Sequence, residues 1–545
     1  MRLGSKFLIV AMIVMMICCV SAASATDVGD IVVPEDTEVI EIDDAVDSVD
    51  VVEQEDSSDD VIEDVVADDI NSAVNEDESD DANDDILDEN SRAGPGYNIV
   101  NSSNYLQYFD LPTGLFKNTC NLEFQGTFSN LHVNNLPFKY FVINKDIKLR
   151  FTNAVFNNVG FKLLYPGLTI DGGATFTNNE WPLIEESIYV GANNVTIKNV
   201  NINVNAPSNK NCYAINVLDS NYTQLLNNNI YYLCNYSNPD YYNYVIKVKN
   251  STGVKIAGNT ITADLPLKTV KHYEPGIEGL DKDFVAGVGV TNSSYLNFTK
   301  NTVDITANRR VGDYPTLDAF IMWYSDNSYV GDNTISVIDE ETSEDEYSYI
   351  YGVDLYKSNY VDVYNNTINM NADQSGGYVG GNGTGAAYCV QCTGSYTGVT
   401  VSNNRLTTKN NGPNAAIYSQ NWDGPTSITV SGNTIEVTGK GTDINWDVLT
   451  GMELQDTYAT VTGNTITVTN NGDYYDGYNV YGISYCQYTP YGHTYVITGN
   501  TVDVDGGKYT IFLLSGTTNT ISGNTLSSYD GINHYSGNQT IETNG

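Results

Sequence analysis

Carboxylate side chains are the groups in this sequence that could do chemistry on a sugar, because glycoside hydrolysis uses two of them. Asp354 and Glu453 occupy the same place in two similar segments, GVDL and MEL. If these segments are stacked strands, three repeats separate them, or about 14 Å at the strand spacing of about 4.8 Å. Hydrolysis requires carboxyl groups about 5–5.5 Å or about 6.5–9.5 Å apart. This pair is too widely separated to be catalytic.

A polysaccharide lyase would instead need clustered carboxylates for Ca²⁺ and a Lys or Arg as the base. Lys247 also lies about three repeats from Asp354, so this combination does not assemble either. Loop residues such as Asp318, Asp326 and Arg309-Arg310 would change this only if the fold gathered them. We therefore predict no catalytic residue, no metal ligand and no cofactor, and Ca²⁺ has no specific support.

Cysteine and histidine residues do not form a recognisable metal motif. Cys389 and Cys392 have CxxC spacing, but no second pair and no neighbouring His accompanies them. A disulfide or a buried thiol is the favoured interpretation. The four His residues are dispersed along the chain without ligand spacing.

Aromatic side chains beside polar ones are the remaining chemical feature. Flat rings next to Asp, Asn and Gln suit a sugar, because its apolar face stacks on a ring while its hydroxyls form hydrogen bonds. The alternative is that the rings pack against each other across strands and bind nothing. The predicted ligand-binding residues are Trp323, Tyr324, Asp354, Tyr356, Gln391, Trp422 and Asp423.

The elements that must position these residues are short repeated strands. Segments such as ITVSGNTIEV (428–437) and ATVTGNTITV (459–468) recur along the chain, and each contains two alternating apolar and polar runs around a turn. The Gly or Asn before the shared Asn tolerates a positive φ and so allows a sharp turn. A third strand, such as GVDL or MEL, lies upstream in each repeat.

Three short strands per repeat predict an all-β fold, a right-handed parallel β-helix of at least ten coils. One Asn marks each coil and should stack on the next as a structural ladder, not as a binding site. The ladder residues are Asn228, Asn259, Asn301, Asn333, Asn366, Asn404, Asn433, Asn464, Asn500 and Asn524. The outward residues of the upstream strand are predicted to be Asn216, Lys247, Gly289, Ile321, Asp354, Gln391, an ambiguous position near Ser419, Glu453, Ser484 and Phe512.

The N-terminal part of the chain has a different character. Residues 1–25 have the basic start, apolar core and small-residue cleavage site of a signal peptide. Residues 26–93 form an acidic segment without aromatic residues, which we expect to be disordered. Residues 94–190 are expected to cap the β-helix and form its first coils, and 191–545 to form its repeats. The net charge of −43 argues against nucleic acid as a partner.

The signal, the acidic stretch, the segment YLQYFD…LEFQGTFSN…FVINKDIKLRF and the TVSGNTI-like coils together resemble the adhesin-like proteins of methanogenic archaea. The resemblance implies a role in attachment at the cell surface. We therefore expect a secreted protein that binds glycans or cell surfaces through the outward face and edge loops of the solenoid. The apolar run of the signal is short for a membrane span and no second span follows, so we expect none in the mature chain. Two alternatives remain, a secreted polysaccharide lyase or glycoside hydrolase on the same scaffold and a purely structural envelope protein. Ten Asn-x-Ser/Thr sequons, for example at Asn194 and Asn382, permit glycosylation.

Overall fold

The computed structural model describes residues 96–542, with gaps. The gaps are 112, 134–135, 180–183, 207–211, 235–242, 266–283, 308–315, 341–348, 373–385, 411–413, 422–425, 440–447, 472–479, 487–493, 508, 514–518, 529–531 and 535–538. The expected signal peptide and acidic segment therefore lie outside the described residues, as do Trp422, Asp423 and most of the two largest insertions.

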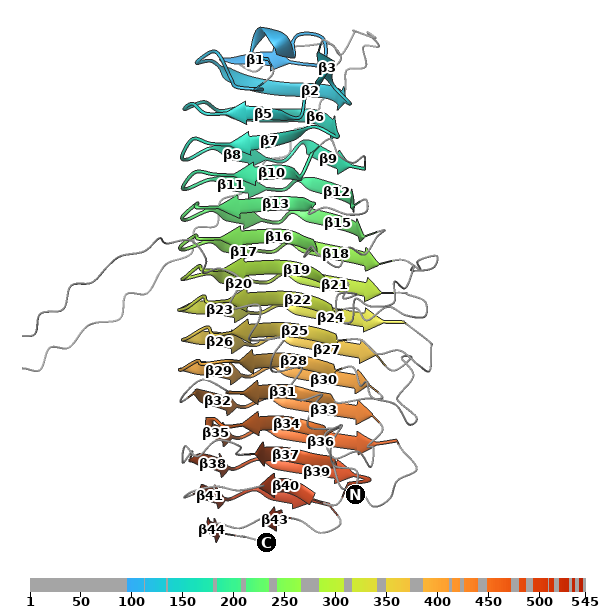
Figure 1. Cartoon of the computed structure of the whole chain (residues 1–545), viewed down its shortest axis with the longest axis vertical. Coiled ribbons are helices and arrows are strands. Elements are labelled where there is room, and N and C mark those ends of the chain that lie inside the picture. Colours follow the sequence, from blue (N-terminus) through green and yellow to red (C-terminus); the bar gives the residue numbers. More distant parts are fainter. Residues whose placement is uncertain are drawn as a thin grey trace, which may run out of the picture. The chain divides into compact units, whose positions relative to one another are not determined.

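The described residues form three parallel sheets that stack coil upon coil (Figure 1). The 15 strands of sheet A are β1 (Tyr97–Val100), β2 (Asn121–Ser129), β6 (Leu149–Asn157), β9 (Ala174–Asn178), β12 (Asn201–Ala206), β15 (Asn229–Cys234), β18 (Thr260–Leu265), β21 (Thr302–Ala307), β24 (Thr334–Asp339), β27 (Thr367–Ala372), β30 (Arg405–Asn410), β33 (Thr434–Gly439), β36 (Thr465–Asn470), β39 (Thr501–Asp505) and β42 (Thr525–Ser527).

The 14 strands of sheet B are β5 (Tyr140–Ile143), β7 (Gly160–Leu163), β10 (Glu186–Val190), β13 (Tyr213–Leu218), β16 (Asn243–Lys249), β19 (Phe284–Thr291), β22 (Thr316–Trp323), β25 (Tyr349–Tyr356), β28 (Ala386–Thr393), β31 (Asn414–Gln420), β34 (Leu449–Gln455), β37 (Val480–Cys486), β40 (Tyr509–Leu513) and β43 (Ile532–His534).

The 13 strands of sheet C are β8 (Thr169–Asp171), β11 (Thr196–Lys198), β14 (Gln224–Leu226), β17 (Lys255–Ala257), β20 (Asn297–Thr299), β23 (Ser328–Gly331), β26 (Val361–Tyr364), β29 (Val399–Ser402), β32 (Ser427–Ser431), β35 (Tyr458–Thr462), β38 (Tyr495–Thr498), β41 (Asn519–Ser522) and β44 (Gln539–Glu542). A short antiparallel pair, β3 (His132–Val133) and β4 (Leu136–Pro137), lies outside these sheets.

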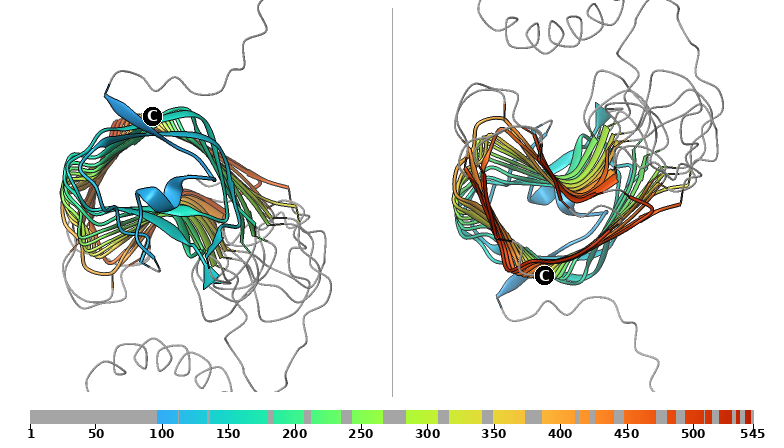
Figure 2. Two further views of the ribbon diagram at one scale, coloured as in Figure 1. Left: turned by 90° about the horizontal axis from the view of Figure 1, so that it is seen from above. Right: turned by 90° about the horizontal axis from the view of Figure 1, so that it is seen from below.

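Each coil runs through sheet B, then sheet C, then sheet A, and the next coil adds one parallel strand to each. Seen along the stack, the three sheets surround the axis of the coils (Figure 2). Buried inward side chains fill the interior. In one coil these are Met322 of β22, Val330 of β23 and Val337 of β24, all fully buried. Parallel crossovers of this kind are right-handed, and the fold is the predicted right-handed parallel β-helix.

The turn between sheets C and A carries the marker Asn of each coil. The side-chain Nδ2 of each Asn donates to Oδ1 of the next, over distances of 2.9–3.1 Å in nine consecutive links from Asn228 to Asn524. The residue before each marker has a positive φ, including Lys300 at 55°. The turn prediction from the Gly and Asn residues is confirmed there.

Phenylalanine rings and a short 3-10 helix, η1 (Tyr105–Gln107), close the N-terminal end of the stack (Figure 2). Phe128, Phe156 and Phe176 sit in three successive strands of sheet A, and their rings stack at centroid distances of 5.0 and 5.1 Å. Tyr105 of the helix packs edge-on against Phe141. This cluster keeps water from the first coil, which has no preceding coil to cover it.

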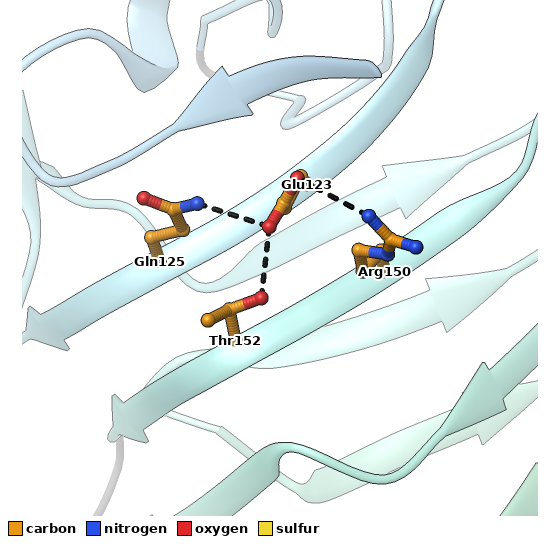
Figure 3. Close-up of polar contacts among 4 residues, drawn as sticks. All are labelled: Glu123, Gln125, Arg150 and Thr152. Atoms are coloured by element: carbon orange, nitrogen blue, oxygen red, sulfur yellow. Dashed lines mark hydrogen bonds and ion pairs between the residues drawn. The ribbon is translucent and has the colours of Figure 1, made fainter. Parts of the chain in front are cut away.

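A buried carboxylate on the outside of this cap does not follow from the sequence pattern. Glu123 is 3% exposed and accepts hydrogen bonds from Gln125 Nε2 at 3.0 Å and Thr152 Oγ1 at 2.8 Å (Figure 3). Arg150, its partner in the next strand, lies 3.9 Å away and covers the ring of Tyr97. Because donors and a cation surround it, Glu123 stabilises the first two strands and is not a free functional group.

Candidate functional site

The outer face of sheet B carries two columns of outward side chains, three residues apart in each strand. The first column runs Ala286, Asp318, Tyr351, Tyr388, Ala415, Thr450, Tyr481 and Tyr509. The second runs Asn216, Lys247, Gly289, Ile321, Asp354, Gln391, Tyr418, Glu453, Ser484 and Phe512. The second column follows the predicted register, and Tyr418 occupies the position left ambiguous near Ser419.

A small residue lies between the columns in seven successive strands of sheet B, from β19 to β37, at a bend where the pairing with the next strand skips one residue. In successive coils it is Gly287, Ala319, Gly352, Cys389, Ala416, Gly451 or Gly482, each one residue after the first column. A Cβ on Gly352 would lie 2.6 Å from the carbonyl oxygen of Cys389, so the strands approach too closely for a larger side chain. Strict alternation does not foresee this bend and therefore predicts one column where the structure has two.

Two carboxyl groups lie in adjacent coils of this face, one in each column, and the charge of one affects the other. Asp318 of β22 pairs in register with Tyr351, and Asp354 lies three residues beyond Tyr351 in β25. Asp318 is fully buried and neither of its oxygens has a hydrogen-bond partner among the described residues. Asp354 is 7% exposed, and its Oδ1 also lacks a partner there. The expectation that Asp318 lies in a loop is wrong, because the bend places it inside a strand.

Burial changes the acidity of both groups. It raises the pKa of Asp354 to about 7, against a smaller opposing effect of a hydrogen bond with Gln391. Burial, together with the charge of Asp354, raises the pKa of Asp318 well above its ordinary value. Burial disfavours the charged form of a carboxyl group, and a like charge nearby disfavours it further. Both groups therefore stay protonated to a higher pH than an exposed carboxyl group does.

Glu453 lies three coils beyond Asp354 in the same column, as predicted. Burial raises its pKa to about 7, although the side chain is only partly shielded from water and Gln455 donates a hydrogen bond to it. Tyr418 donates to Gln420 Oε1 at 2.6 Å in the preceding coil. Glu453 thus belongs to a polar cluster separate from the Asp318–Asp354 pair.

Aromatic rings line the same face. Tyr388 stacks on Tyr418 at 4.6 Å and lies 5.8 Å from Tyr351, so three successive coils contribute to one ring series. Trp323 and Tyr356 are paired in register at the other edge of the face, with ring centroids 6.5 Å apart. All five side chains are only partly buried and expose ring surface to water.

The predicted ligand-binding residues are brought together only in part. Asp354 and Gln391 contact each other, and Trp323 and Tyr356 lie beside them in strands β22 and β25. Tyr324 follows Trp323 at a corner with φ 52°, and its ring packs edge-on against Tyr356 at 5.4 Å. Three tyrosines of this face are absent from the prediction, although they recur before the apolar strand residues: Tyr351, Tyr388 and Tyr418.

Cysteines and acidic side chains offer no metal centre in the part of the chain that the structure describes. Cys389 and Cys392 are buried free thiols, and burial raises the pKa of both well above its ordinary range. No three His, Cys, Asp or Glu side chains among the described residues lie together as metal ligands would. No helix among those residues is long and apolar enough to cross a membrane.

Comparison with known proteins identifies similar solved structures. The chain matches no protein-family model. No curated relative is found by sequence. The tailspike protein of Escherichia coli bacteriophage HK620, in complex with a pentasaccharide, is 12% identical with a TM-score of 0.37, over 76% of this chain and 70% of that one.

Two further structures have similar coil architecture. The surface adhesin PfbA of Streptococcus pneumoniae is 13% identical with a TM-score of 0.31, over 75% of this chain and 85% of that one. The periplasmic alginate epimerase AlgG is 10% identical with a TM-score of 0.32, over 78% and 83% of the two chains. The fold assignment rests on the strand register of this chain itself.

Proposed function

We propose that this protein is a secreted, adhesin-like cell-surface protein that binds saccharides through the outer face of sheet B. The observation that carries the proposal is the exposed ring surface beside amide and carboxyl groups at Trp323, Tyr356, Gln391 and Asp354. Rings receive the apolar face of a sugar, and the polar groups receive its hydroxyls. Trp422 and Asp423, which the sequence predicts to bind the same ligand, lie outside the described residues.

Secretion, surface location and a methanogen-type origin rest on the sequence. The signal-like residues 1–25 support export, and the acidic residues 26–93 suit a solvated spacer. The resemblance to adhesin-like proteins of methanogenic archaea supports attachment as the role. Glycosylation at the Asn-x-Ser/Thr sequons is part of the same proposal.

Binding of the full chain to a panel of soluble glycans and to cells tests the proposal. We expect Trp323→Ala and Gln391→Ala to weaken binding, because each removes one of the two kinds of contact. Val496→Ala, a change at an exposed position in sheet C, is the matched control and should bind as the wild type does. Equal binding by Trp323→Ala, Gln391→Ala and the wild type would contradict the assignment.

Glycoside hydrolysis is the second candidate function, and the Asp318–Asp354 pair specifically favours it. One protonated carboxyl could donate a proton to the glycosidic oxygen while the other, ionised, takes a proton from the attacking water. The shielding of both carboxyl groups from water ranks this function second, because a sugar cannot reach Asp318 in the present conformation.

Release of reducing ends from polysaccharides separates the two candidates. Hydrolysis predicts product release by the wild type and its loss in both Asp318→Asn and Asp354→Asn. Retention of glycan without product supports the binding role. If the protein neither retains glycan nor releases product, a structural envelope role is favoured.

A further inference from the structure

One corner of each coil, between sheets B and C, holds a residue with left-handed backbone. In seven successive coils this residue is Asn194, Tyr222, Gly253, Tyr295, Asn327, Tyr360 or Gly398, with φ between 53° and 68°. The backbone N–H of each of the first six donates to a carbonyl of the next coil, for example Tyr222 to Thr252 at 2.8 Å and Tyr360 to Thr397 at 2.9 Å, and that of Gly398 donates to Ser427 Oγ at 2.9 Å. The seven residues therefore form one column along the stack.

Tyrosine is energetically unfavourable at this corner because of the left-handed backbone. Asn and Gly accept a left-handed backbone easily, and they fill the other four positions of the column. Tyr222, Tyr295 and Tyr360 nevertheless expose 58%, 61% and 58% of their surface, so burial in the core does not offset the strained backbone. Residues held in strained conformations concentrate at functional sites.

The three tyrosines alternate with smaller residues. Gly253, Asn327 and Gly398 occupy the intervening and following coils, so one ring projects in every second coil. A Cβ on Gly253 would lie 2.7 Å from Cδ1 and 2.9 Å from Cε1 of Tyr222, and one on Gly398 would meet Tyr360 in the same way. The two glycines thus leave room for the rings of Tyr222 and Tyr360 to lie against the next coil, while more than half of the surface of each tyrosine stays exposed.

We propose that Tyr222, Tyr295 and Tyr360, the tyrosine row, bind an extended, β-1,4-linked polysaccharide. The two-coil step between rings is about 9.6 Å at a strand spacing of about 4.8 Å. In such a polysaccharide alternate sugars turn the same face to one side, so one disaccharide spans the step between rings. Each ring then receives the apolar face of every second sugar.

Polar side chains next to the row complete the site. Asn221, Ser294 and Asn359 each precede one of the three tyrosines. Thr252 N–H donates to Asn221 Oδ1 at 2.8 Å and Thr397 N–H to Asn359 Oδ1 at 3.0 Å, which fixes both amides. Asp326 takes the same place before Asn327 and accepts from Asn359 Nδ2 at 2.9 Å. Amides, a hydroxyl and one carboxylate therefore lie beside the rings, as hydrogen-bonding groups for the hydroxyls of a sugar chain. The row includes no residue of the sheet B face and does not rest on the function proposed for it.

Retention of the full chain on insoluble cellulose and chitin, with insoluble amylose as the α-1,4-linked comparison, tests the proposal. We expect the wild type to bind at least one β-1,4-linked polymer and to bind amylose at least about tenfold more weakly, a difference of about 1.4 kcal/mol. The triple variant Tyr222→Ala, Tyr295→Ala, Tyr360→Ala should lose at least about tenfold in affinity for the β-1,4-linked polymer.

A second variant tests the spacing itself. The exchange Tyr295→Asn with Asn327→Tyr keeps three tyrosines and the same composition, but it changes the steps between rings to three coils and one. We expect this variant to bind as weakly as the triple variant while keeping the circular dichroism spectrum of the wild type. Tyr231→Ala, at an exposed tyrosine of sheet A without left-handed backbone, is the matched control and should bind normally.

Three outcomes would overturn the proposal: a wild type retained by neither cellulose nor chitin, equal retention on amylose, or undiminished binding by the exchange variant. Trp323→Ala separates this result from the function proposed for sheet B. It should leave retention on the β-1,4-linked polymer unchanged, even if it abolishes soluble glycan binding.

Discussion

A single buried amide satisfies several backbone and side-chain groups at each turn of the stack. Asn333 Oδ1 accepts from both Asn301 N–H and Asn301 Nδ2, at 2.9 and 3.1 Å. Its Nδ2 donates to Asn366 Oδ1 and to the carbonyl of Phe298, both at 2.9 Å. No other uncharged side chain of this size offers two donors and an acceptor in that geometry. The ladder therefore specifies Asn for structural reasons.

Asn333→Ala should destabilise the protein by about 3–5 kcal/mol, because it leaves several buried donors and acceptors without partners at about 1–3 kcal/mol each. The midpoint of urea unfolding measures the change. Asn365→Gly is the control, since Asn365 has φ 54° and its amide makes an exposed hydrogen bond to Asp332. If Asn333→Ala lowered the urea midpoint no more than Asn365→Gly does, the structural role of the ladder would be refuted.

Each tyrosine of the row is proposed to favour polysaccharide binding, while its left-handed backbone lowers the stability of the fold. Tyr295 has φ 56° and is 61% exposed, so its side chain gains little from the fold. Tyr295→Asn should raise the free energy of unfolding by about 1 kcal/mol, because Asn tolerates this backbone better. Chemical denaturation measures the gain. A destabilised variant would show that the ring supports the fold instead.

At the scale of the element, the bend in sheet B positions the candidate site. Gly451 lies between Thr450 and Glu453, and a Cβ there would lie 2.4 Å from Ile466 Cγ2 and 2.6 Å from the Gly482 carbonyl. Without small residues in this column, the strands would separate and the two outward columns would lose their spacing. The bend is thus a structural requirement of the face that presents the carboxyl pair.

Gly451→Ala should cost about 1–3 kcal/mol of stability, since the added methyl group overfills a closely packed position. The thermal unfolding midpoint measures it. Gly463→Asn is the matched control, because Gly463 has φ 64° and a Cβ added there would have nothing within 4 Å. A Gly451→Ala midpoint equal to that of the control would mean that the coils can move apart.

Much of the element structure follows from the sequence. The GNT-type turns and alternating strands of sheets A and C are predicted by period and turn chemistry, and the second column of sheet B follows from strand alignment. The position of the first column does not follow from the sequence pattern, because the bend at residues such as Gly352 and Cys389 changes which side chains of the strand point outward. Alternation alone therefore misplaces Asp318 and misses the proximity of two carboxyl groups in adjacent coils.

At the scale of the whole molecule, buried carboxyl groups link stability to pH. The folded-state pKa values of Asp354 and Glu453 are raised to about 7, and that of Asp318 is raised as well. The unfolded chain releases these protons near a pH of about 4. The folded state therefore binds more protons between about pH 4 and 7, and stability falls as the pH rises through this range.

The thermal midpoint should accordingly be higher at about pH 5 than at about pH 8. Asp318→Asn with Asp354→Asn should flatten this dependence in part, because two of these three carboxyl groups are removed. Glu453 and the net charge of −43 also favour acidic conditions, and their effects remain in the double variant. A pH profile unchanged by the double substitution would assign the whole dependence to Glu453 and net charge.

The asparagine ladder has a direction. Each Nδ2–H points toward the following coil, so a finished coil presents donors already aimed at the next Asn oxygen. Such a surface acts as a template onto which the chain can add one coil at a time. The coils before Asn228 carry no ladder Asn, so they must form without this template, and growth along the ladder can begin only at Asn228.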